Sequence, residues 1–320
     1  MFIQLFRNKV YESRKFKNAL RRLDKYIAQN KSSLREEQLI AGLANQWKQQ
    51  NRIFLKDFNI RGKKYSFFAD FFQIKTHGHP YLSVDDQVSL ASQNIEFKTE
   101  FGDLALIVDY RFDNKLISRK LSIIQSKKEL SANQAQIAIH QLYLMQFWPN
   151  IQINNRVFDF RHIENPDKFA FYHFILNKHN NPRYSSSICS APYIALNLGK
   201  SKIDLENDLV AWCQKRRVNN KEPPPHEILS MPLVPGQIYN HGKSYEWNKL
   251  ARPFYNFLLD AAYQNIGTND LNLLKIASLR IPNILALQVT GTAGDNEFRS
   301  IDDLFYGEIG SDDDDKIIFT

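Results

Sequence analysis

Disulfide bonds and membrane spans have little support in this sequence. Only two cysteines, Cys189 and Cys213, occur among 320 residues, which excludes a disulfide framework and predicts two buried thiols in a reducing cytoplasm. No run of 18 apolar residues is present, so neither a transmembrane helix nor a membrane partner is expected. The apolar stretch at the N-terminus is too short for a signal peptide. We therefore expect a cytoplasmic protein.

Nucleotide-binding loops are missing as well. Neither GxGxxG nor GxxxxGK followed by Ser or Thr occurs, so the sequence gives no support for a phosphate-cradling loop. Apolar residues make up 43% of the chain and aromatic residues 13%. This composition supplies a sizeable core for one large domain or two modest ones. Gly291 is interpreted as part of a flexible turn.

The net charge is +8, and it is unevenly distributed. Residues 1–64 contain 16 Lys or Arg and 5 Asp or Glu, whereas residues 295–320 contain 9 acids and 2 bases. A basic helix is predicted over residues 12–29, and such a face suits contact with a polyanion such as DNA, although a solvated helix face fits equally well. The candidate nucleic-acid contacts are Arg14, Lys15, Lys17, Arg21, Arg22 and, further along the chain, Lys128. The acidic tail, 311–320, is interpreted as solvated.

Two strands joined by a turn are predicted in the middle of the chain. Residues 104–110 form a nearly unbroken apolar run, which is typical of a strand buried on both faces. Residues 121–124 are apolar again, and polarity begins abruptly at Gln125. If the strands pair in antiparallel fashion, Asp103 before the first strand meets Gln125 and Lys127 after the second. Because Gln125 and Lys127 are two apart, they share a face.

These three residue types suit metal-assisted cleavage of phosphodiesters. Polar groups beside apolar strands need partners, and a divalent ion can be one. Asp103 and Gln125 offer the hard oxygen ligands that Mg²⁺ prefers. The Lys127 ammonium can position a water molecule or stabilise negative charge on a phosphate. An ordinary hairpin with an extended lysine is the simpler interpretation.

The paired segments GDLALIV and SIIQSKK resemble the Asp…(Asp/Glu/Gln)-x-Lys signature of the PD-(D/E)xK, or restriction-endonuclease-like, superfamily in its Gln-x-Lys variant. They are similar in particular to bacterial proteins with GDLL-type and LLIQAK-type strands followed by a Gln-rich helix ending in Trp-Pro. Residues 131–149 fit that helix, and the resemblance covers residues 36–150.

The resemblance implies an α/β fold with a mixed central sheet flanked by helices, and Mg²⁺ or Mn²⁺ as cofactor. It implies DNA rather than RNA as substrate, in a bacterial defence, mobile-element or repair setting, with a homodimer or a partner protein of a defence system. It casts Asp103 and Gln125 as metal ligands and Lys127 as the catalytic lysine. Where the family often has an acid, Gln125 is neutral, which weakens metal affinity and raises the alternative of an inactive relative.

Other acids can complete the metal site. Glu100 lies three residues before Asp103 and is a candidate ligand, or it faces solvent. A helix is predicted from an N-cap at Ser32 or Ser33 to about residue 50. The resemblance implies that a helix before the sheet supplies a Glu, here Glu37 or Glu36; simple stabilisation of the helix dipole is the competing interpretation.

Two further segments have the same spacing. Glu96-Phe97-Lys98 is a literal Glu-x-Lys, but it follows a polar run, so no strand is predicted to lead into it. Gln73-Ile74-Lys75 ends an apolar run that contains an acid. His77 and His79 lie in a loop with no third metal ligand of the same kind nearby, which argues against zinc. The Asp103–Lys127 assignment is preferred.

The sequence therefore predicts a restriction-endonuclease-like core with additional C-terminal α+β elements. We divide it into a basic N-terminal helix (1–30), a nuclease-like core (31–150), a C-terminal extension or second subdomain (151–310) and the acidic tail. The predicted function is a Mg²⁺-dependent endonuclease acting on DNA. The alternative is a catalytically inactive protein on the same fold that binds nucleic acid or a protein partner.

Overall fold

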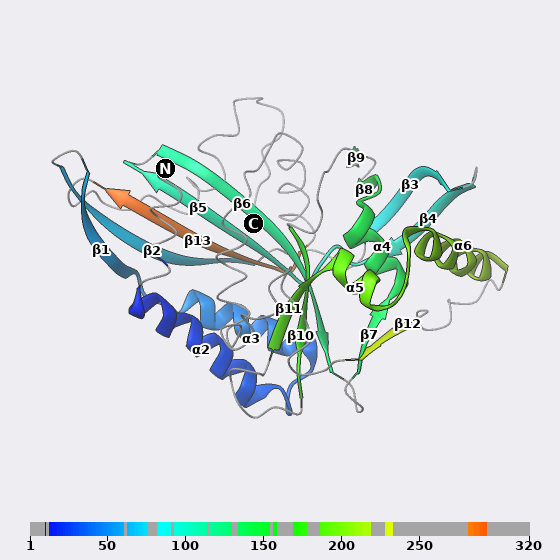
Figure 1. Cartoon of the computed structure of the whole chain (residues 1–320), viewed down its shortest axis with the longest axis horizontal. Helices are drawn as coiled ribbons and strands as arrows, with labels where there is room; N and C mark the ends of the chain where they lie inside the picture. Colours follow the sequence, from blue (N-terminus) through cyan, green and yellow to red (C-terminus); the bar gives the residue numbers. More distant parts are fainter. Residues whose placement is uncertain are drawn as a thin grey trace.

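The computed structural model describes residues 10, 13–60, 63–75, 82–90, 93–113, 115–129, 134–153, 156–158, 169–177, 186–218, 228–232 and 281–292. A mixed seven-stranded sheet forms its centre (Figure 1). The strands, in their order across the sheet, are β1 (Ile53–Ile60), β2 (Lys63–Lys75), β13 (Asn283–Thr292), β5 (Leu104–Phe112), β6 (Lys115–Lys128), β10 (Ala170–Ile175) and β11 (Ser186–Ser190). Two neighbouring pairs, β13–β5 and β10–β6, are parallel. The expected α/β fold with a mixed central sheet flanked by helices is confirmed.

The predicted hairpin is the pair β5–β6. Leu104 lies opposite Ile124, and Ile107 lies opposite Leu121, in antiparallel register. The run in β5 is continuously apolar because both faces are covered: Ala105 and Ile107 pack into one hydrophobic cluster, and Leu106 and Val108 pack into the other. Asp113 closes the turn with a positive φ of 47°, a conformation that Asp tolerates better than most residues.

Two helices, α2 (Arg14–Asn30) and α3 (Glu36–Lys48), cover one face of the sheet (Figure 1). Ser13 caps α2 by accepting a hydrogen bond from the backbone N–H of Phe16. Trp47 of α3 is fully buried and donates its indole N–H to the carbonyl of Ala286 in β13, at 3.1 Å. This bond ties the helix layer to the middle of the sheet.

The start of α3 was predicted too early in the chain. Its N-cap is Arg35, not Ser32 or Ser33. The backbone N–H groups of Ser33 and Leu34 instead donate to the carbonyl of Asn30. These bonds form a tight turn that follows directly from α2, so the serines end the first helix and do not begin the second.

The opposite face of the sheet is covered by α4 (Ile139–Phe147), α5 (Ala191–Asn197) and α6 (Lys202–Val218). Beside them lies a four-stranded sheet in the order β4 (Gln93–Thr99), β3 (Leu82–Leu90), β8 (Ile151–Ile153) and β9 (Arg156–Phe158) (Figure 1). No helix in the described ranges is long and apolar enough to cross a membrane.

The single helix expected over residues 131–149 is wrong for its first half. Residues Gln134–Ala138 form strand β7, paired with β12 (Ile228–Pro232), and only the second half forms the helix α4. Gln134 and Gln136 are exposed while Ala135 and Ile137 are buried. This alternation has the period of two that a strand requires.

Residues beyond 150 complete the central sheet, because β10, β11 and β13 all belong to it. Gly291 lies inside β13 and not in a flexible turn. A Cβ atom at Gly291 would approach Cε1 of Phe67 at 2.7 Å and Cδ2 of Phe112 at 3.1 Å. Glycine is needed there because the neighbouring aromatic rings leave no space for a side chain.

The His77–His79 loop and the acidic tail lie outside the described residues.

Candidate active site

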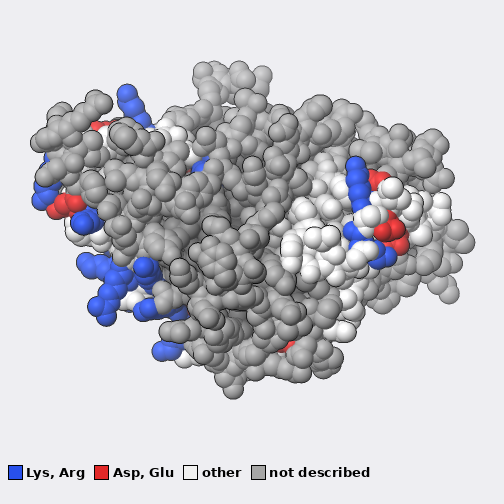
Figure 2. Space-filling model, in the orientation of Figure 1, with Lys and Arg blue, Asp and Glu red and all other residues white. Residues whose placement is uncertain are grey.

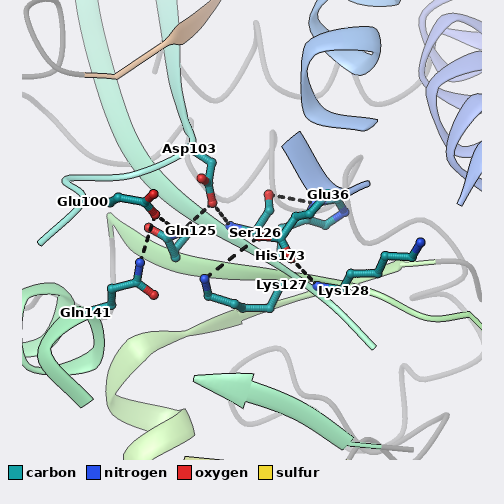
Figure 3. A network of polar contacts seen from close by, with 9 residues as sticks. All are labelled: Glu36, Glu100, Asp103, Gln125, Ser126, Lys127, Lys128, Gln141 and His173. Atoms are coloured by element: carbon teal, nitrogen blue, oxygen red, sulfur yellow. Dashed lines mark hydrogen bonds and ion pairs between the residues drawn. The ribbon is translucent and has the colours of Figure 1, made fainter. Parts of the chain in front are cut away.

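The open end of the β5–β6 hairpin brings Asp103 and Gln125 into direct contact (Figure 3). Gln125 Nε2 donates to Oδ2 of Asp103 at 2.6 Å, and the backbone N–H of Ser126 donates to the same oxygen at 2.6 Å. The backbone N–H of Asp103 donates to the carbonyl of Ile124, which extends the hairpin to this point. The prediction that the two strand ends meet is confirmed.

Glu100 and Gln141 extend this polar group toward α4. Gln141 Nε2 donates to Oε2 of Glu100 at 3.0 Å, and Gln125 Nε2 lies 3.4 Å from the same oxygen. Glu100 therefore faces the site. Gln141 was not identified from the sequence. Its signal is a polar side chain within the otherwise nearly apolar buried segment 139–145 of α4, since such a group needs a polar partner.

Glu36 enters the site from the first turn of α3. Its Oε1 lies 4.0 Å from Nζ of Lys127, and its Oε2 accepts the backbone N–H of Lys128. Burial raises the pKa of Glu36, while Lys127 and the bond from Lys128 act in the opposite direction. Of the two acids considered for this helix, Glu36 faces Lys127, whereas Glu37 is exposed to solvent.

The site carries an excess of negative charge. The pKa of Asp103 is raised to about 7: burial is the largest cause and the Glu100 and Glu36 carboxylates add to it, while the Lys127 ammonium and the Ser126 N–H act in the opposite direction. Three partly buried carboxyl groups thus act on one ammonium among the described residues. A divalent cation would relieve this repulsion, because its charge favours the ionised form of every carboxyl group around it.

The end of the hairpin offers carboxylate and amide oxygen atoms as possible ligands for a divalent cation. Within the described ranges, no group of three or more His, Cys, Asp and Glu side chains is arranged to hold a metal, so a cation here also needs an amide oxygen. Gln125 is 1% exposed, and its Oε1 has no hydrogen-bond partner among the described residues. Carboxylate and amide oxygens are the ligands that Mg²⁺ and Mn²⁺ accept. The residues present fit a hard divalent cation.

Two lysines fix the turn that precedes α3. Nζ of Lys128 donates to the carbonyl of Leu34 at 2.9 Å, and Nζ of Lys31 donates to the carbonyl of Leu176 at 2.5 Å. Lys31 is almost fully buried. These bonds join the turn to the ends of β6 and β10 and place Glu36 beside Lys127. The Lys128 ammonium, expected to contact nucleic acid, is thus bonded within the protein.

The basic helix α2 presents its charges to solvent. Figure 2 shows Lys and Arg side chains gathered at the lower left, over α2. Lys17 is partly buried, and the exposed basic residues of α2 are Arg14, Lys15, Arg21, Arg22 and Lys25. Ile123 packs on the face of the sheet opposite to α2. Because Gln125 is two residues further along the same strand, its side chain points to that same face, opposite to the basic helix.

Neither competing segment belongs to the β5–β6 hairpin. Gln73 Nε2 donates to Oδ1 of Asn283 within the central sheet. Glu96 lies in β4, which begins at Gln93, so the expectation that no strand leads into Glu96 is wrong. As an edge strand of the smaller sheet, β4 does not need the apolar run that a central strand requires.

No protein-family model matches this chain, and neither a curated protein nor a solved structure is significantly similar to it.

Proposed function

We propose that this chain is a divalent-cation-dependent nuclease that hydrolyses phosphodiester bonds of DNA, with Mg²⁺ or Mn²⁺ as cofactor. One observation carries the proposal: Asp103 and Glu100 both contact the amide of Gln125 at the end of a buried hairpin, and the Lys127 ammonium, which Glu36 approaches at 4.0 Å, lies nearby. Burying carboxyl groups together is costly unless a cation joins them.

Each side chain has a distinct part in this proposal. Asp103 and Gln125 hold the cation, and Glu100 adds a third oxygen ligand. Lys127 stabilises negative charge on the phosphate or orients the attacking water, and Glu36 positions its ammonium. The cation, when bound, neutralises phosphate charge and activates water as a nucleophile. Gln125 would coordinate through Oε1, the amide atom that has no partner among the described residues.

The fold is consistent with the restriction-endonuclease-like resemblance. That resemblance implies a mixed sheet flanked by helices, acidic and lysine residues at adjacent strand ends, and a Glu supplied by a helix before the sheet. The hairpin β5–β6 and the start of α3 supply such elements. Strand β13, inserted between β2 and β5, comes from outside the segment that carries the resemblance.

A second function is favoured by the bonds of Gln125. Its Nε2 already donates to Asp103 and lies within 3.4 Å of Glu100, so both carboxyl groups have a hydrogen-bond donor without a cation. This arrangement suits a catalytically inactive protein that binds nucleic acid through its basic helix. The two functions differ in whether Lys127 is required for cleavage.

Cleavage of supercoiled plasmid in Mg²⁺ or Mn²⁺ tests the proposal. The wild type is compared with Lys127→Ala and with Lys115→Ala, the same substitution at an exposed position on the other end of β6. We expect cleavage by the wild type and Lys115→Ala, inhibition by EDTA, and loss of cleavage but retained DNA binding in Lys127→Ala. Normal cleavage by Lys127→Ala would reject the site. Binding of DNA without cleavage by the wild type, in either ion, would favour the inactive protein.

A further inference from the structure

Tyr172 is a buried side chain beside the candidate site to which no role has yet been given. It lies in β10 directly opposite Gln125 in the parallel pair β10–β6, and paired residues of neighbouring strands project from the same face of a sheet. Its side chain is 0% exposed and packs in the hydrophobic cluster that also contains Ala105 and Ile123.

The hydroxyl of Tyr172 has no hydrogen-bond partner among the residues that the structure describes. A buried hydroxyl normally finds a partner, because removing it from water without one is unfavourable. Burial and the nearby Asp103 carboxylate both raise the pKa of Tyr172. The side chain therefore remains a neutral hydroxyl, with one proton to donate and lone pairs to accept.

Two more buried atoms near the same carboxyl groups lack a partner in the described part of the chain. They are Oε1 of Gln125 and Oε1 of Gln141, whose amide nitrogens already donate to Asp103 and Glu100 respectively. All three atoms can accept hydrogen bonds. A place with three buried acceptor atoms beside acidic groups suits a ligand that donates several hydrogen bonds.

Water molecules held by a divalent cation are such donors. Mg²⁺ prefers six oxygen ligands and releases its waters reluctantly, whereas Asp103, Glu100 and Gln125 offer only a few oxygens. The remaining ligands would be water, and the protons of these waters need acceptors. An anion such as phosphate alone does not fit, because it would lie against carboxyl groups.

We propose that the hydroxyl of Tyr172 and the amide oxygen of Gln141 line the cation site and accept hydrogen bonds from the water molecules that the cation retains. This inference rests on the proposed function. It makes Tyr172 a positioning residue from a third strand, which acts on the cation through water and not as a direct ligand.

Tyr172→Phe tests this inference, because it removes only the hydroxyl. Binding of MnCl₂ and MgCl₂ to the full chain is measured by titration calorimetry near pH 8. Stability of the metal-free protein is measured separately, by urea unfolding in EDTA. Tyr143→Phe, in the same hydrophobic cluster, is the control for loss of a buried tyrosine hydroxyl.

We expect Tyr172→Phe to weaken cation affinity roughly tenfold, as is typical when a group that orients a metal's ligands is removed. Metal-free stability should stay unchanged or increase, because an unpartnered polar group is removed, and Tyr143→Phe should bind the cation like the wild type. Wild-type cation affinity in Tyr172→Phe would overturn the inference and leave the proposed function standing. Lower metal-free stability would also overturn it, since the hydroxyl would then have a partner within the protein. A wild type that binds neither cation would overturn both proposals.

Discussion

Replacing Asp103 by Asn is expected to stabilise the metal-free protein above neutral pH. The pKa of Asp103 is about 7 in the folded chain, against an ordinary value of 3.8. Between these values the folded state retains a proton that the unfolded chain has released. The stability that this proton provides is fully present below pH 3.8 and is lost as the pH rises through about 7. The amide of asparagine resembles the neutral carboxylic acid at every pH.

The size of the effect follows from the two pKa values. They differ by about 3, and each pH unit corresponds to 1.36 kcal/mol, so the penalty above pH 7 is roughly 4 kcal/mol. Relaxation around Lys127 reduces it, and we expect a gain of about 2 to 4 kcal/mol. Both hydrogen bonds to Asp103 end on one oxygen, Oδ2. The single amide oxygen of Asn can therefore accept both.

Urea unfolding in EDTA, near pH 8 and near pH 4.5, measures this gain. Asp103→Asn should be more stable than the wild type near pH 8 and closer to it near pH 4.5. Asp113→Asn, exposed in the hairpin turn with a φ of 47°, is the control and should lack this pH dependence. A gain that is equal at both pH values, or a loss near pH 8, would refute the charge argument. Adding Mg²⁺ near pH 8 should reverse the order, since the wild type alone keeps the carboxylate.

Asp109→Ala should destabilise the fold by about 3 to 5 kcal/mol, because the buried guanidinium of Arg119 loses its two 2.9 Å bonds to that carboxylate. Asp57→Ala, which breaks a surface ion pair, is the control. Equal losses of stability for the two variants in urea unfolding would contradict the argument. Lys128→Met should cost about 1 kcal/mol of stability, because it removes the hydrogen bond to the carbonyl of Leu34. The salt dependence of DNA binding should not change. A shallower salt dependence would identify Lys128 as a phosphate contact. Alanine is placed at the exposed basic positions Arg14, Lys15, Arg21 and Arg22 of α2. The slope of log DNA affinity against log salt concentration should become shallower by about 0.9 for each phosphate that the helix no longer neutralises. An unchanged slope would identify a solvated helix face.

The hairpin could be predicted because its signals are local. The apolar run 104–110 reports burial on both faces, and Asp113 marks the turn. If the apolar run forms a strand and the turn follows it, antiparallel pairing with the next strand brings Asp103 beside Gln125. The coarse fold class, in contrast, was expected only because the superfamily resemblance implies a mixed sheet flanked by helices.

Contacts between distant segments could not be predicted. Asn283–Thr292 lies between β2 and β5, yet nothing near it in sequence specifies these partners. Gln141 and Tyr172 reach the site only because α4 covers the sheet and β10 pairs with β6. The start of α3 depends on hydrogen bonds to Asn30, which outweighed the preference of serine for an N-cap position.

The central position of β13 affects how this protein can fold during synthesis. Both β2 and β5 hydrogen-bond to β13, but about 170 residues separate the end of β5 from the start of β13. At roughly 5 to 20 residues per second, a ribosome needs on the order of 10 to 30 s to translate that interval. For this time the inner edges of β2 and β5 lack their final partner. Such edges can pair with other chains, so the nascent protein is expected to depend on chaperones until its last described strand has emerged.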